Sequence, residues 1–206
     1  NHESRIMNQG KRDFFLAGGR IARAKHTDLI VDAFIKNGLP LKLFGKGFAG
    51  FEEEIKDRIK NHESQLRQGF AGQAKIEFLG EVSDGEKDKL MAGAKAFISA
   101  SQDEDFGIVP VEAMMVGTPV IAHRSGGVLE TVIEPSASVR QAQDKSSGQG
   151  ATGLFFDDFS VESLNNAIKK FEKTKFDSRE IAKHAQKFSR ERFEKEIKEY
   201  VSKITK

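Results

Sequence analysis

The stretch Ser99-Ala-Ser-Gln-Asp-Glu-Asp-Phe-Gly-Ile-Val-Pro-Val-Glu-Ala-Met-Met-Val-Gly117 decides the fold class of this chain. The apolar run at 96–99 that leads into it predicts a buried strand, and residues 109–116 have the apolar spacing of a helix. Pro110 suits the first turn of that helix, where its missing N–H would have no partner in any case. A strand, an acidic turn containing a glycine, and a helix in this order are typical of a βαβ unit.

The same alternation of strands and helices continues on both sides of this stretch. Strands are expected at 14–17, 41–44, 75–79, 96–99 and 119–122, and helices at 27–36, 52–66, 86–92 and 109–116. This order predicts an α/β fold, in which a Rossmann-like parallel sheet is covered by helices on both faces. Right-handed crossovers place the carboxyl ends of all the strands at one edge, where α/β proteins bind their ligands.

The domain organisation follows from the remaining segments. We expect residues 1–12 to be a polar leader from a truncated longer chain, and residues 13–206 to be one domain. The segment 135–150 is rich in Ser, Gln and Gly and is expected to be a flexible surface loop. C-terminal helices are expected over 160–206, starting at the N-cap Ser160. Their apolar stripes comprise Leu164, Ile168 and Phe171, and then Phe193, Ile197, Tyr200, Val201 and Ile204.

Composition excludes several classes of function. The 206 residues carry 33 Lys and Arg against 31 Asp and Glu, a formal net charge of +2, so we expect no nucleic-acid partner. There is no cysteine and hence no cysteine-based metal site. No apolar run approaches the roughly 20 residues of a membrane span, and no signal peptide is visible. We therefore expect a cytoplasmic protein.

Two groups of residues at the expected ligand edge could bind an anion. In Gly18-Gly-Arg-Ile-Ala-Arg-Ala-Lys25, Arg20 offers a planar fork of donors and Lys25 a point charge. The alternative is that these are solvated loop cations. The N–H groups of 107–109 are free to hold a phosphate or a sugar hydroxyl at the start of a helix. Glu104 and Glu112 can reach the same cleft, where carboxylates would accept hydrogen bonds from sugar hydroxyls.

A formal dinucleotide motif, Gly45-Lys-Gly-Phe-Ala-Gly50, follows the second expected strand. Read literally, it predicts NAD or FAD with the pyrophosphate at a helix N-terminus. However, it does not follow the first strand, and no strand-terminal acid stands about 20 residues further on. A glycine turn that lines some other ligand is the better interpretation.

Taken in order, these segments resemble the C-terminal, donor-binding domain of retaining GT-B glycosyltransferases of the GT4 type. The resemblance covers about 14–193 and rests on an ordered set of short motifs: Gly19-Arg20…Lys25, Phe78-Leu-Gly80, Ser99-Ala-Ser101, Glu104-x7-Glu112, Gly117-Thr-Pro-Val-Ile121, Gly126-Gly127…Glu130 and Thr152-Gly-Leu154. The stretch 104–113 and the tail 176–193 are similar to the WbaZ-like mannosyltransferase branch. That branch implies GDP-mannose as donor and a role in the assembly of O-antigen and other surface polysaccharides.

The resemblance implies a role for each matched residue. Arg20 and Lys25 would bind the donor diphosphate and stabilise the leaving nucleotide, and Glu104 would hold hydroxyls of the transferred sugar; these three form the implied catalytic group. Glu112 would hold the ribose hydroxyls. The other implied donor-binding residues are Gly19, Gly45, Gly47, Glu81, Val82, Phe106, Gly107, Ile108 and Val109. No metal and no cofactor are implied.

The resemblance also implies partners. The acceptor-binding N-terminal domain would precede this segment in the same chain, and the acceptor would be a saccharide or a lipid-linked saccharide. Any contact with the inner face of the cell membrane would be made through that N-terminal half. Two alternatives stay open: a glucosyl- or N-acetylglucosaminyltransferase that uses a UDP-sugar, and a non-catalytic nucleotide-binding α/β module.

Overall fold

A single parallel sheet forms the centre of the protein. The computed structural model describes residues 12–67, 75–135 and 150–204. Within them the strands are β1 (Phe14–Ile21), β2 (Leu41–Gly47), β3 (Ile76–Phe78), β4 (Ala94–Ser99), β5 (Val120–His123) and β6 (Gly153–Phe156). They form one six-stranded sheet in the order β3-β2-β1-β4-β5-β6, and every neighbouring pair is parallel. The α/β prediction is confirmed.

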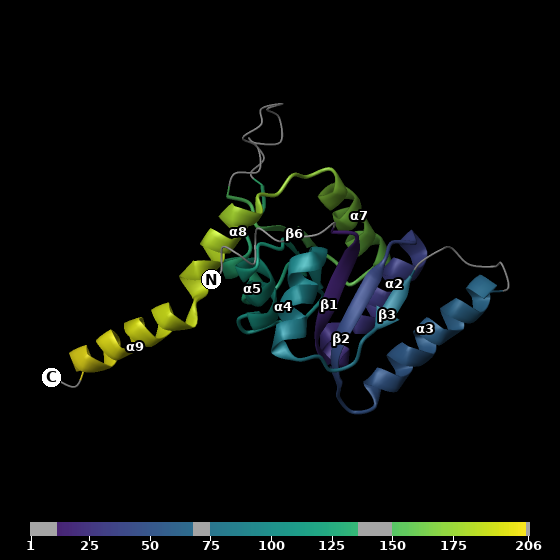
Figure 1. Ribbon diagram of the computed structural model, residues 1–206, viewed down its shortest axis with the longest axis horizontal. Helices are drawn as coiled ribbons and strands as arrows, with labels where there is room; N and C mark the ends of the chain where they lie inside the picture. Colours follow the sequence, from purple (N-terminus) through teal and green to yellow (C-terminus); the bar gives the residue numbers. More distant parts are fainter. Residues whose placement is uncertain (1–11, 68–74, 136–149, 205–206) are drawn as a thin grey trace.

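Helices cover both faces of this sheet (Figure 1). One layer consists of α2 (Thr27–Asn37), α3 (Phe51–Arg67) and α7 (Val161–Glu172). The other consists of α4 (Asp84–Gly93), α5 (Ile108–Met115), the short α6 (Val128–Thr131) and α8 (Ser178–Ala185). Because each face of a parallel sheet is buried, each layer packs its apolar side chains into a separate core cluster.

Local hydrogen bonds explain where several helices begin. The Ser160 hydroxyl accepts from the Ser163 N–H, which confirms the predicted N-cap of α7. Ser83 and Glu86 form a reciprocal capping box at the start of α4, and Asp177 caps α8. The predicted apolar stripe of α7 is buried, with Leu164 and Ile168 almost inaccessible to solvent.

The strand order creates a topological switch point beside β1. The chain winds outward from β1 to β3, and then returns to place β4 against the opposite side of β1. The connections that leave β1 and β4 therefore run in opposite directions. In an open α/β sheet this divergence leaves a crevice beyond the carboxyl ends of the two strands.

Two strands extend further than predicted. Residues 18–20 and 45–47 were expected to lie in turns, but they belong to β1 and β2, and Gly19 lies opposite Gly45 in the ladder. The expectation was wrong because ladder pairing outweighs the tendency of glycine to form turns. Gly45 has a φ of 137°, and a Cβ there would overlap the carbonyl oxygen of Gly19. Only glycine allows the two backbones to approach so closely.

The C-terminal helix α9 (Arg190–Ile204) extends away from the rest of the molecule (Figure 1). After the short 3₁₀ turn at Gln186–Phe188, it leaves its predicted apolar stripe exposed, with Phe193 and Ile204 each 65% accessible. None of the helices in the described ranges has the length and apolar character needed to cross a bilayer.

Two of the predicted segments fall largely outside the described residues. Of the predicted leader 1–12, only Arg12 is described; its guanidinium donates to the Gly117 carbonyl at 3.2 Å. Of the predicted loop 135–150, only its two end residues are described. The predictions for these segments therefore stay predictions.

Candidate functional site

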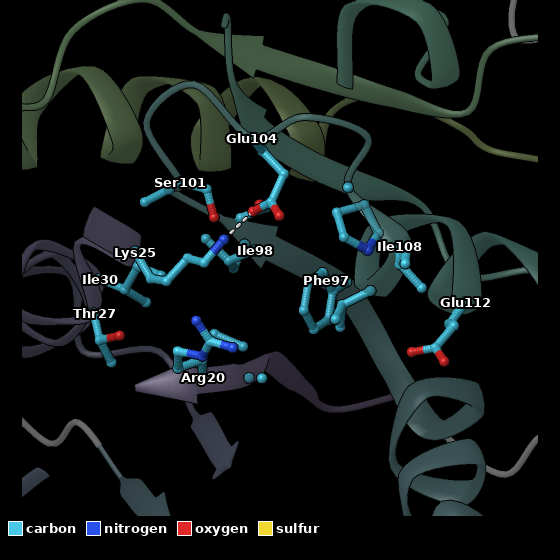
Figure 2. A pocket seen from close by; sticks show the side chains of 18 of the residues that line it. Arg20, Lys25, Thr27, Ile30, Phe97, Ile98, Ser101, Glu104, Ile108 and Glu112 are labelled. Carbon is cyan, nitrogen blue, oxygen red and sulfur yellow. Dashed lines mark hydrogen bonds and ion pairs between the residues drawn. The ribbon is translucent and has the colours of Figure 1, made fainter. Parts of the chain in front are cut away.

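A cavity of about 570 Å³ opens at the switch point, beyond the carboxyl ends of β1 and β4. Its walls are the end of β1, the 3₁₀ turn η1 (Arg23–Lys25), the turn after β4 and the first two turns of α5 (Figure 2). Among its lining residues are these predicted ones: Gly19, Arg20, Lys25, Glu104, Phe106, Gly107, Ile108, Val109 and Glu112.

Two cations lie on the β1 side of this cavity. Arg20 is carried by the end of β1 and is exposed, with its guanidinium carbon 5.9 Å from the centre of the Phe48 ring. Lys25 extends from η1, and its ammonium group forms an ion pair with the Glu104 carboxylate (Figure 2). The Gln102 N–H donates to the Ala24 carbonyl at 3.1 Å and joins the two loops that carry this pair.

The acidic turn is held from behind by the Gly126-Gly127 turn. The Gly127 N–H donates to the Glu104 carbonyl at 2.6 Å. A Cβ on Gly127 would lie only 2.6 Å from the Cα of Phe106, so no larger residue fits without moving the turn. By itself the Gly-Gly pair predicted nothing more specific than a loop. The structure shows that it positions the backbone of Glu104.

The environment of Glu104 favours its ionised form. Burial by itself would raise the pKa of Glu104, but hydrogen bonds from Lys25 and Ser101 and the charges of Lys25 and Arg20 outweigh it. The pKa of Glu104 is therefore lowered. At neutral pH the cavity holds a carboxylate that can only accept hydrogen bonds.

This arrangement predicts the titration of Glu104. We expect its carboxyl carbon, followed by NMR, to titrate below the usual range for glutamate, and Lys25→Met to move the midpoint upward. Because the folded-state pKa is the lower one, the pair stabilises the fold above the unfolded-state pKa. That stabilisation is lost as the pH falls through the folded-state pKa. Lys42→Met serves as the control, because it removes a different ion pair, the one in which the Lys42 ammonium lies 3.5 Å from Glu77. An unchanged Glu104 midpoint in Lys25→Met would contradict the prediction.

Helix α5 presents its N-terminus to the cavity. It begins after Gly107, which has a left-handed φ of 78°, and Pro110 lies in its first turn as predicted. The N–H groups of Ile108 and Val109 stand in the first turn, where no intrahelical acceptor exists, and the helix dipole adds partial positive charge there. One turn further on, Glu112 also lines the cavity. The site therefore combines anion-binding and hydroxyl-binding groups.

Comparison with known proteins shows the family of this chain. The sequence profile of the family described as "Glycosyl transferases group 1" matches residues 2–192. The chain belongs to the glycosyl transferases group 1 family. The resemblance suggested by the motifs is thereby confirmed at the level of the family.

The chain is also similar to individual curated proteins. It is 26% identical over 209 residues to the mouse (Mus musculus) "Alpha-1,3/1,6-mannosyltransferase ALG2". This match covers 97% of this chain and 47% of the relative. It is 30% identical over 156 residues to "Glycogen synthase" of Thermodesulfovibrio yellowstonii, with 74% of this chain and 26% of the relative covered. The chain thus spans less than half the length of these curated relatives.

A solved structure confirms the fold at domain level. The C-terminal domain of a glycosyl transferase group 1 family protein (LpcC) from Francisella tularensis superposes with a TM-score of 0.58 at 19% identity. The match covers 90% of this chain and 88% of that one. At this identity the likeness shows the Rossmann-like GT-B fold and nothing about the ligand.

Four predicted donor-binding residues of this group 1 domain do not line the cavity. Gly45 packs against Gly19, and the Gly47 N–H donates to Glu52 Oε2 at 2.7 Å. Glu81 lies 3.7 Å from Lys46 in an exposed ion pair, and Val82 packs against the core of the α4–α5 layer. All four follow or end the neighbouring strands β2 and β3. Since Glu52 already occupies the Gly47 N–H, the G-x-G-x-x-G match does not form an open pyrophosphate cradle.

Two polar residues that the sequence did not single out, Thr27 and Lys87, also line the cavity, together with Ser101 of the Ser99-Ala-Ser101 motif. Ser101 donates to Glu104, and Thr27 begins α2. Lys87 lies on α4, and its ammonium nitrogen is 2.8 Å from Glu112 Oε1. In the sequence Lys87 looks like an ordinary surface lysine three residues after Asp84. Only the packing of α4 beside α5 brings it to the site.

Proposed function

We propose that this domain binds the donor nucleotide sugar of a retaining glycosyltransferase, with GDP-mannose as the donor. The observation that carries the proposal is that one cavity is lined by two kinds of chemical group. Arg20, Lys25 and the N-terminus of α5 favour an anionic diphosphate, whereas Glu104 and Glu112 are acceptors for hydroxyl groups. A nucleoside diphosphate sugar carries both kinds of group in one molecule.

Charge complementarity supports binding of the diphosphate without a metal ion. The guanidinium of Arg20 can donate two parallel hydrogen bonds to phosphate oxygens, and the ammonium of Lys25 supplies a second positive charge. These groups would also stabilise the negative charge that develops on the leaving nucleotide. Glu104 would hold hydroxyls of the transferred sugar after Lys25 turns from it toward the phosphate. Glu112, which lies on the opposite side of the view from Lys25 in Figure 2, would take the ribose hydroxyls.

Mannose is the proposed sugar because the mouse relative that matches most of this chain is named a mannosyltransferase. The similarity of 104–113 and 176–193 to the WbaZ-like branch leads to the same sugar and to surface-polysaccharide assembly of the O-antigen type. The match to a protein named "Glycogen synthase" keeps open a second candidate, a glucosyl- or N-acetylglucosaminyltransferase, for which we propose a UDP-sugar as the donor. In either case the acceptor, a saccharide or lipid-linked saccharide, would be bound by an N-terminal domain of the same protein, in the cytoplasm at the inner membrane face.

Calorimetry on the 206-residue chain tests the proposal. GDP-mannose, UDP-glucose and UDP-N-acetylglucosamine are titrated in turn, each with and without EDTA. We expect GDP-mannose to bind most tightly, with an affinity that EDTA leaves unchanged. Tighter binding of a UDP-sugar would contradict GDP-mannose as the donor and favour the second candidate, a glucosyl- or N-acetylglucosaminyltransferase. Absence of heat with all three at millimolar concentration would overturn the donor-binding function.

A further inference from the structure

We infer that Lys87 is a positioning residue, which orients Glu112 and thereby makes the site select ribonucleotides over 2′-deoxyribonucleotides. The inference rests on the proposed function, because it assigns a role to one side of the same donor site. It goes beyond that function by naming a residue on a different helix, α4, which would act on the donor through its hold on Glu112.

The position of Lys87 is fixed by its surroundings. The Lys87 N–H donates to the Ser83 carbonyl at 2.8 Å, within the helical turn that the Ser83–Glu86 capping box closes. Its ammonium nitrogen lies 2.8 Å from Glu112 Oε1 and 3.4 Å from Asp84 Oδ1. Its side chain is only 20% exposed, whereas that of Asp84 is 99% exposed. Glu112 is therefore the stronger partner of Lys87.

The electrostatic balance keeps Lys87 charged. Burial by itself would lower the pKa of Lys87, but the hydrogen bonds and charges of Glu112 and Asp84 outweigh it, and the pKa is raised. The ammonium group is thus present throughout the neutral range. It compensates the charge of a Glu112 side chain that is itself only 33% exposed.

The geometry of the Lys87–Glu112 pair suggests how the site distinguishes ribose from 2′-deoxyribose. Lys87 engages Oε1 of Glu112, so the carboxylate is held in one orientation and Oε2 is the oxygen that would accept from a ribose hydroxyl. A carboxylate built into a site to accept from a hydroxyl penalises a ligand that lacks it, because the acceptor is then left unpaired. Without Lys87, the Glu112 side chain could rotate into solvent and the penalty would shrink. The pair would therefore set both the affinity for nucleotides and the preference for the 2′-hydroxyl.

The test compares Lys87→Met, Lys87→Arg and Glu112→Gln with the unaltered chain. Calorimetry measures the affinity of each for GDP, UDP and their 2′-deoxy counterparts. For the nucleotide that the unaltered chain binds, we expect Lys87→Met to weaken binding about tenfold and to reduce the ribo-to-deoxy ratio as far as Glu112→Gln does. Lys87→Arg, which keeps the charge, should retain most of the ratio. A variant that combines Lys87→Met with Glu112→Gln should bind the nucleotide only slightly more weakly than either single variant, because both changes remove the same interaction.

Lys95→Met is the matched control. It removes another partly buried lysine from an ion pair, 3.4 Å from Glu172, outside the cavity lining. It should leave both affinity and ratio unchanged, and thermal unfolding verifies that each variant is folded. If Glu112→Gln lowers the ribo-to-deoxy affinity ratio and a folded Lys87→Met does not, Lys87 only joins α4 to α5, and the inference is overturned. If the unaltered chain binds none of the four nucleotides, the proposed function fails and the inference fails with it.

Discussion

Replacing Arg20 by alanine is expected to weaken nucleotide-sugar binding by about 1.5–3 kcal/mol, or about 10- to 150-fold in Kd. Arg20 is the cation at the end of β1 that can form two parallel hydrogen bonds with a phosphate. Lys25 has an internal partner in Glu104, whereas Arg20 makes no ion pair with a neighbour within the described part of the cavity wall. Its positive charge is thus available to a ligand. Arg20→Lys should recover only part of the loss, because the ammonium group lacks the planar fork.

Arg23→Ala provides the matched control for Arg20→Ala. Arg23 is also an exposed arginine after β1, but it pairs with Glu54 and lies over the Phe51 ring at 4.9 Å, outside the cavity. We expect its removal to leave the affinity within about a factor of two, since exposed ion pairs contribute little. Calorimetry on both variants at several salt concentrations is the measurement. Equal affinities for Arg20→Ala and the unaltered chain would favour a degenerate, non-catalytic module.

Replacing Phe34 by alanine is expected to lower the free energy of unfolding by about 3–5 kcal/mol. Phe34 is fully buried on α2, and its ring centre lies 5.3 Å from that of Phe15 on β1. Phe15 in turn contacts Phe171 of α7 at 5.8 Å, so the three rings join two helices to the central strand. Truncation would leave a cavity that this rigid contact between helix and sheet cannot close.

Phe193→Ala is the control for Phe34→Ala. Phe193 is 65% exposed on α9, so the same change in chemistry should shift the free energy of unfolding by no more than about 0.5 kcal/mol. Urea unfolding followed by circular dichroism compares the two variants. A loss below about 1 kcal/mol for Phe34→Ala would mean that the core around β1 repacks, contrary to the expected rigidity.

Much of the fold could be predicted because its signals are local. Short apolar runs that alternate with helical stripes specify strands and helices in order. Ser160 marks the start of α7 through a hydrogen bond to a residue only three positions further along the chain. The ends of β1 and β2 could not be predicted in this way. Glycine is a turn residue when read by itself, and the pairing of Gly19 with Gly45 depends on a neighbouring strand.

The residues of the cavity also differ in whether a local sequence signal could predict them. Arg20, Lys25, Glu104 and Glu112 belong to short motifs next to strand ends, and the parallel topology gathers such ends at one edge. Gly47, by contrast, belongs to a formal phosphate motif, but its N–H is already bound by Glu52. Sequence spacing does not reveal whether a backbone donor is already satisfied, because that depends on side chains fixed by packing.

The sequence by itself determined the α/β class, the order of the elements and the family, and it pointed to the segment from Glu104 to Glu112 that lines the candidate site. It could do so because periodicity, capping and motif order are properties of residues close together along the chain. Only the tertiary structure decided that Gly127 holds Glu104, that Lys25 pairs with it and that Lys87 reaches Glu112 from α4. These contacts join elements distant in sequence, and they exist only once the sheet has brought its carboxyl edge together.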